Sequence, residues 1–149
     1  MKHTETQIGW HINIFFILVI ILFPVLYLFQ IGTNPTPLFL TIIFTLIFIV
    51  VFLIFYKLSI SIDGDYIRIT YGIGIIQKNI KITDIASVKK VRNKWYYGWG
   101  IRFIGKGWLY NISGLDAIEL SFKNKSSIVR IGISKSSNLE NKLNQIITK

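Results

Sequence analysis

The sequence predicts an α+β membrane protein, in which a two-helix transmembrane hairpin precedes a small antiparallel β-barrel that is closed by a carboxyl-terminal helix. The 149 residues are 52% hydrophobic with a mean hydropathy of +0.52, which is more apolar than an ordinary soluble domain. Two stretches, 14–29 and 38–56, contain no Asp, Glu, Lys or Arg. Beyond residue 56 the apolar residues follow the two-residue period of strands. These observations divide the chain into a helical hairpin, 1–56, and a β-rich domain, 57–149.

The hairpin is predicted to have spans at about 12–31 and 38–56, since each approaches the roughly 20 apolar residues that cross a bilayer core. Between them, Gly32, Pro35 and Pro37 interrupt the helix and turn the chain. The two ends of the hairpin therefore lie on the same side of the membrane.

The charges beside the spans predict which side this is. Lys57 and Arg68 follow the second span and Lys2 precedes the first, whereas the connecting loop carries no charge. Lys and Arg are in excess on the cytoplasmic side of membrane proteins. We therefore expect a multi-pass protein of the cell inner (plasma) membrane with both termini in the cytoplasm.

The spans contain no charged residue that would mark a pathway for solutes. Thr41 and Thr45 are four residues apart on the second span, so they share one face of that helix. Small hydroxyl residues commonly pack or hydrogen-bond between membrane helices. We expect these two threonines to serve span packing.

The β-rich domain opens with a hairpin. Leu58, Ile60 and Ile62 alternate with polar residues, Asp63-Gly64-Asp65 supplies a tight turn, and a second alternating run reaches Tyr71. Further strand-like runs follow at 75–82, 87–91, 99–104, 108–112, 117–122 and 128–133. Short strands at such regular spacing indicate a small antiparallel barrel or sandwich.

The chain ends in a predicted amphipathic helix at about 138–148. Leu139, Leu143 and Ile146 recur at helical spacing, and Ser137 with Glu140 matches a capping box at the helix start. A terminal helix with one apolar face is suited to cover an open corner of a barrel.

Several segments of the domain also support a family resemblance. The segments are "GWGIR" at 98–102, "GWLYNISGLDAIEL" at 107–120 and "VRIGIS" at 129–134, the last followed by the capped helix. With the preceding spans, this order resembles the membrane-anchored bacterial PH-like (pleckstrin-homology-like) domain proteins. The resemblance implies a PH-like barrel, a fold that hosts many binding roles and does not define one. The turn Asp63-Gly64-Asp65 would repel phosphate, so the phosphoinositide binding of better-known members is not expected here.

The sequence predicts no enzyme, no metal site and no cofactor. There is no cysteine, His3 and His11 both precede the first span, and the six acidic residues of 57–149 are scattered along the chain. No nucleophile and base pair, and no cluster with metal-ligand spacing, can be assembled from these residues.

One segment is a candidate membrane or partner surface. Residues 57–149 hold sixteen of the seventeen Lys and Arg residues, and part of this charge adjoins four aromatic residues at 95–99. Clustered bases and exposed aromatic rings suit an anionic membrane interface. In the alternative interpretation the bases face water while the aromatic rings fill the barrel, and the pattern is compatible with Trp95 and Trp99 pointing either way. The candidate residues are Lys89, Lys90, Arg92, Lys94, Trp95, Tyr96 and Trp99.

We expect a non-catalytic binding or scaffold module at the cytoplasmic face, with another protein or a second copy of the chain as its partner. One alternative is a module that senses anionic lipid through residues 89–99, and another is an accessory subunit that acts through its spans. The net charge of +10 also suits nucleic acid. No nucleic-acid-binding motif accompanies that charge, so nucleic acid is not the expected partner.

Overall fold

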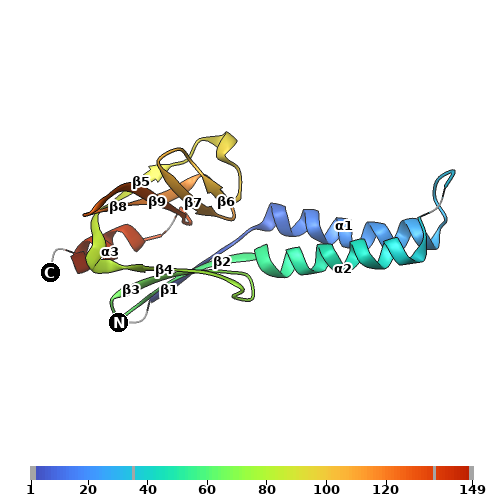
Figure 1. The fold of residues 1–149 in the computed structure, drawn as a ribbon, viewed down its shortest axis with the longest axis horizontal. Helices are drawn as coiled ribbons and strands as arrows, with labels where there is room; N and C mark the ends of the chain where they lie inside the picture. The colour runs from blue at the N-terminus through green and yellow to red at the C-terminus, as the bar shows by residue number, and fades with distance from the viewer. Residues whose placement is uncertain (1–2, 35, 136, 148–149) are drawn as a thin grey trace.

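The structure is a computed structural model that describes residues 3–34, 36–135 and 137–147. A long helical hairpin extends from one end of a β-rich domain. Both ends of the chain lie at that domain and away from the tip of the hairpin (Figure 1). In chain order the elements are β1 (His3–Ile8), α1 (Trp10–Leu28), α2 (Leu38–Phe55), β2 (Lys57–Asp63), β3 (Tyr66–Tyr71), β4 (Ile76–Lys81), the 3-10 turn η1 (Ile82–Asp84), β5 (Ile85–Arg92), the 3-10 turn η2 (Trp95–Tyr97), β6 (Gly100–Phe103), β7 (Gly107–Asn111), β8 (Asp116–Phe122), β9 (Lys125–Gly132) and α3 (Leu139–Ile147).

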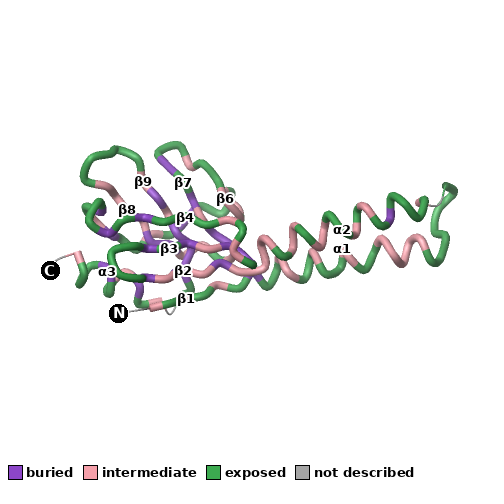
Figure 2. The backbone as a smooth tube through the Cα atoms, turned by 60° about the horizontal axis from the view of Figure 1, so that its bottom comes forward, coloured by how far each residue is buried: buried purple, intermediate pink, exposed green. Residues whose placement is uncertain are grey.

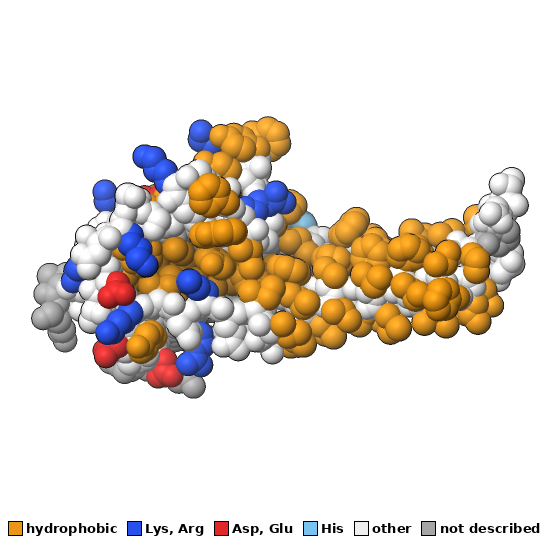
Figure 3. Space-filling model, viewed as in Figure 1, with side chains coloured by type: hydrophobic (Ala, Val, Ile, Leu, Met, Phe, Trp, Pro, Cys, Tyr) orange, Lys and Arg blue, Asp and Glu red, His pale blue; other side chains and the backbone are white. Residues whose placement is uncertain are grey.

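The two predicted spans are helices α1 and α2, and both are long and apolar enough to cross a membrane. Their residues are a mixture of exposed and partly buried ones, as the burial colouring of the hairpin shows (Figure 2). Apolar side chains cover the hairpin almost completely, while Lys and Arg lie on the β-rich domain (Figure 3). Such an exposed apolar surface is typical of helices that contact lipid.

Aromatic stacking joins the two helices. Phe23 of α1 stacks on Phe44 with ring centroids 5.3 Å apart and also contacts Phe48. Among the described residues of α1 and α2, Thr41 alone is buried. Its hydroxyl donates to the Pro37 carbonyl of the same helix, 3.2 Å away, and the Thr45 hydroxyl oxygen is buried without a partner among the described residues. Phenylalanine rings therefore make contacts between the helices, and the role of Thr41 and Thr45 in span packing stays a prediction.

The strands form two separate sheets. The first has the order β1-β2-β3-β4, with every pair antiparallel. The second has the order β5-β8-β9-β7-β6, in which β7 and β9 are parallel. Each strand predicted beyond residue 56 corresponds to one of β2–β9. The alternating apolar residues of both sheets, including Leu58, Ile69, Ile118 and Ile131, form one buried core with those of α3.

The predicted antiparallel barrel is not formed, because the two sheets do not join into one and β7 and β9 are parallel. The short turn η1 carries the chain from β4 to β5 without pairing them. On β4, Lys78 lies opposite the buried Ile69 of β3, at a position that faces the other sheet. A charged residue that points inward from an edge strand opposes further strand pairing. The β4 side of the domain therefore stays open.

Helix α3 covers the opposite opening. It packs on β5, and Leu139 and Leu143 are fully buried in the core, which confirms the predicted helix and its apolar face. Ile146, predicted as the third core residue, is 42% exposed, and Ile147 packs on the core instead. Ser137 accepts the N–H of Leu139 as predicted for a cap, but Glu140 accepts the N–H of Lys90 on β5. The predicted capping box is thus only half formed.

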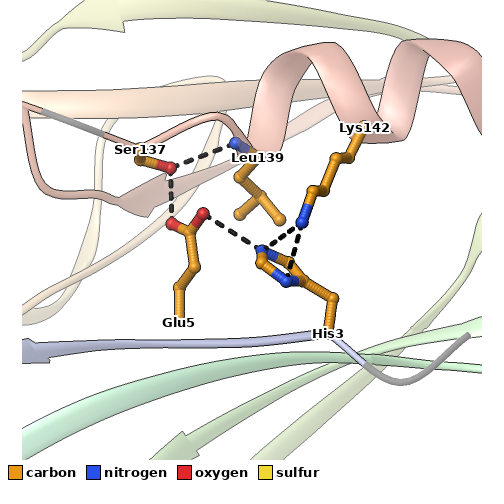
Figure 4. A network of polar contacts seen from close by, with 5 residues as sticks. All are labelled: His3, Glu5, Ser137, Leu139 and Lys142. Carbon is orange, nitrogen blue, oxygen red and sulfur yellow. Dashed lines mark hydrogen bonds and ion pairs between the residues drawn. The ribbon is translucent and has the colours of Figure 1, made fainter.

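The amino-terminal segment contributes a strand that its pattern of residues does not predict. β1 precedes the first helix and pairs with β2 along its whole length, so residues from both sides of the hairpin build the first sheet. His3, Glu5 and Gln7 point inward while their neighbours are exposed. Glu5 accepts a hydrogen bond from Ser137, and His3 contacts the Lys142 ammonium of α3 (Figure 4). The sheet is therefore completed from residues that were assigned to the hairpin part of the chain.

Candidate membrane-facing surface

The loop between β5 and β6 exposes its aromatic side chains. Trp95 is 81% exposed, Tyr96 57% and Trp99 45%. Trp95 and Tyr96 meet edge to face, with ring centroids 6.0 Å apart. Positive φ angles at Gly98 and Gly100 bend the chain sharply on either side of Trp99. The aromatic residues therefore face outward, and the interpretation in which they fill a barrel is wrong. We call residues 94–99 the aromatic loop.

The aromatic loop lies at the end of the domain from which the helices emerge (Figure 1). The ring of Trp99 is 6.5 Å from that of His11, the second residue of α1. The preceding residue, Trp10, is 67% exposed. Two tryptophans thus lie at the level where the apolar helix begins, which is the level that tryptophan prefers at a membrane–water boundary.

Two cations accompany these rings. The Lys94 ammonium lies 5.5 Å from the centroid of the Tyr96 ring. A hydrogen bond with Tyr96, together with attraction to the Tyr96 and Tyr97 phenolates once these ionise, raises the pKa of Lys94 above its usual value, so this amine stays positively charged at neutral pH. Arg102 donates from Nε to the carbonyl of Trp99 over 3.1 Å. The loop therefore combines outward-facing rings with fixed positive charge.

The other three candidate bases do not gather on this surface. Lys89 lies on the outer face of its sheet, directly opposite Glu119, which pairs with Arg130 over 2.8 Å. Lys90 lies near α3: its backbone N–H donates to Glu140 of that helix, and its ammonium donates to the carbonyl of Lys135, which precedes the helix. The period of a strand separates neighbouring residues onto opposite faces.

Arg92 is the last residue of β5 and lies beside the end of β1. It lines a shallow depression with Thr6, Ile8 and Asp116, the residue opposite it on β8. The predicted set of seven residues thus divides, and only Lys94, Trp95, Tyr96 and Trp99 share a surface. Arg102 joins them although it was not predicted. Its place in "GWGIR" directly after Trp99 and Gly100 is the signal that would have identified it.

A second feature is the groove left open between the sheets. It has a volume of about 400 Å³ and opens between β4 and the strands β7 and β9. Apolar side chains are visible there between the two sheets in Figure 3, with Lys or Arg at the border. Trp108, Tyr110 and Phe122 line it together with Lys78 and Lys125. Burial raises the pKa of Tyr110, so its hydroxyl stays neutral and can donate.

Within the described ranges, no three His, Asp or Glu side chains are grouped as a metal ion would require. The absence of an active site and of a cofactor stays a prediction. Comparison with protein-family models, with curated protein sequences and with solved structures gave no match for this chain.

Proposed function

We propose that this protein is a non-catalytic module, anchored by two membrane spans, whose β-rich domain works at the surface of an anionic membrane leaflet. The observation that carries this proposal is the exposure of Trp99 beside His11 at the start of α1, in a loop that also exposes Trp95. Tryptophan at that depth stabilises contact with the headgroup region, and Lys94 and Arg102 add attraction for anionic lipid. Because the spans already hold the chain in the membrane, the aromatic loop orients the domain rather than recruiting it.

We also propose that the two helices span the inner (plasma) membrane and that the β-rich domain lies in the cytoplasm. The uncharged loop between α1 and α2 and the basic domain at the other end support this orientation through the bias of positive charge toward the cytoplasm. The inner leaflet is also the one that presents anionic lipid. The resemblance to membrane-anchored PH-like proteins fits the same arrangement, and we retain it as part of the proposal.

The test uses the whole chain, since an isolated fragment of residues 57–149 would lack β1 and leave one edge of β2 unpaired. The chain has no cysteine, so a Trp95→Cys variant accepts a single polarity-sensitive fluorophore. We expect its emission in anionic nanodiscs to be that of an apolar environment. The emission should return to that of water at high salt or in a variant that also carries Lys94→Gln and Arg102→Gln.

The matched control carries Lys89→Gln and Lys90→Gln, which remove two charges that lie away from the aromatic loop. This control should leave the emission unchanged. Equal emission in anionic and neutral nanodiscs, at low and high salt alike, would exclude the lipid-surface function.

A second candidate function is the binding of a protein partner, and the open groove favours it. Trp108, Tyr110 and Phe122 provide an apolar lining on which the apolar side chains of a partner could pack. A scaffold that works this way should retain its partner in mild detergent after Trp95→Ala and lose it after Trp108→Ala. Loss of the partner after Trp95→Ala, with retention after Trp108→Ala, would assign the binding to the aromatic loop.

A further inference from the structure

The turn between β3 and β4 exposes two isoleucines. Ile73 is 58% exposed and Ile75 is 66% exposed, and the turn, residues 72–75, contains no charged residue. The other end of β3 provides an internal comparison, because its turn is the acidic sequence Asp63-Gly64-Asp65. Turns in water are normally polar. The two ends of one strand therefore suit two different environments.

The apolar turn packs against the end of the second helix. The N–H of Ile73 donates to the carbonyl of Leu53 over 3.1 Å, and that of Gly72 donates to the carbonyl of Lys57 over 2.8 Å. The last carbonyls of a helix have no partner within the helix, so the turn satisfies one of them. Gly72 permits this approach, since a Cβ there would lie 2.0 Å from the Leu53 carbonyl oxygen.

These contacts define how deep the turn lies. Leu53 comes two residues before the end of α2, which is about 3 Å along the helix axis. It precedes Lys57, the first charged residue after the span. The turn thus lies beside a part of α2 whose own exposed side chains are all apolar, and its exposed isoleucines extend the apolar surface of the helix.

We propose that the β3–β4 turn inserts Ile73 and Ile75 into the membrane leaflet that contains the start of α1 and the end of α2. This inference rests on the proposed function only in requiring that α1 and α2 span a membrane. The lipid is assigned as the occupant because the turn is continuous with the lipid-facing surface of α2 at the depth of Leu53.

The inserted turn gives the domain a second point of contact with the leaflet. In Figure 1 the β3–β4 turn lies beside the end of α2, and η2 with β6 lies on the other side of the hairpin, near the start of α1. Two contacts on opposite sides of the helical hairpin restrict tilting of the β-rich domain relative to the membrane in both directions, whereas one contact restricts it in one direction. The turn and the aromatic loop together would therefore hold the domain in one orientation relative to the membrane.

The test measures the depth of a single label in vesicles. Ile75→Cys carries the fluorophore in the reconstituted full chain, Asp65→Cys is the matched control on the opposite turn, and Ile47→Cys marks the middle of α2. We expect nitroxide attached to lipid to quench the label at position 75 but not at position 65. Iodide in the water should quench at position 65 and lose its effect at position 75.

The result that overturns the inference is equal quenching by iodide at positions 75 and 65 while position 47 is quenched only from the lipid.

The label at Trp95→Cys separates this failure from that of the proposed function, since it reports the aromatic loop alone. Contact of position 75 without position 95 would support the turn and contradict the lipid surface. Exposure of position 47 to iodide would contradict both. If Ile75→Cys fails to fold, Ile73→Cys decides the same question.

Discussion

The carboxylate of Glu5 accepts a hydrogen bond from the hydroxyl of Ser137, which joins the first strand of the chain to the cap of its last helix (Figure 4). The same hydroxyl oxygen accepts the N–H of Leu139 over 3.2 Å. Ser137 thus serves at once as a helix cap and as a tie between the two ends of the chain. The chain ends are held together although the entire helical hairpin lies between them.

The first prediction concerns this serine. Ser137→Ala should lower the free energy of unfolding by about 1 kcal/mol or more, because the helix loses its cap and Glu5 loses a partner. Urea unfolding in mild detergent, followed by near-ultraviolet circular dichroism, measures the change. The exposed Ser126 provides the control, and Ser126→Ala should leave stability nearly unchanged. Equal stability of the two variants would contradict the role of Ser137.

The second prediction concerns Gln7, which connects β1 to the other sheet. Its side-chain amide donates to the carbonyls of Ser113 and Ile133, and its carbonyl oxygen accepts the N–H of Ile112. Gln7→Ala should cost about 1–3 kcal/mol of unfolding free energy, since it leaves these backbone groups without their partner. The same urea titration applies, with Thr4→Ala on the exposed face of β1 as control. A loss no larger than that of the control would show that the hydrogen bonds of Gln7 do not help to hold β1 in place.

The third prediction compares two glycines with similar backbone angles. Gly64 and Gly72 have φ values of +57° and +48°, but a Cβ at Gly64 meets nothing within 4 Å. Gly64→Ala should therefore cost only the conformational strain of about 1–2 kcal/mol. Gly72→Ala should cost more than about 3 kcal/mol, because it also pushes the β3–β4 turn away from α2. Thermal unfolding of the two variants side by side gives the difference, and similar melting temperatures would contradict the close packing of the turn on the helix.

The fourth prediction concerns alkaline pH. The Tyr71 hydroxyl is buried and donates to the carbonyls of Asn111 and Gly100, each 3.3 Å away. Burial raises the pKa of Tyr71 far above its usual value of about 10, so the folded protein keeps the proton that the unfolded chain releases. The stabilisation is complete below about pH 10 and is lost as the pH rises beyond it.

Tyr71→Phe should therefore be less stable than the parent protein by about 1–2 kcal/mol at neutral pH. Its unfolding free energy should fall less steeply between about pH 10 and pH 12. Urea titrations across that range, for both proteins, provide the measurement. Parallel pH profiles would show that other groups cause the alkaline loss of stability.

Much of the local structure could be predicted from the sequence. The apolar runs gave the two helices, the alternation after residue 56 gave the strands, and Leu139 with Leu143 gave the buried face of α3. These are properties of short segments, where the period of the apolar residues reflects the local geometry. β1 escaped this reasoning because its inward residues, His3, Glu5 and Gln7, are polar and bind other polar groups rather than apolar ones.

By itself the sequence determined that the chain has two apolar helices, a basic β-rich domain and a closing helix. Only the tertiary structure decided that the sheets stay open at β4, that Trp95 and Trp99 face outward, and that Arg102 rather than Lys89 or Lys90 accompanies them. Those outcomes depend on which strands become neighbours and on which face each residue then occupies. Strand pairing between distant segments is a property of the whole fold, so the spacing of residues within one segment does not encode it.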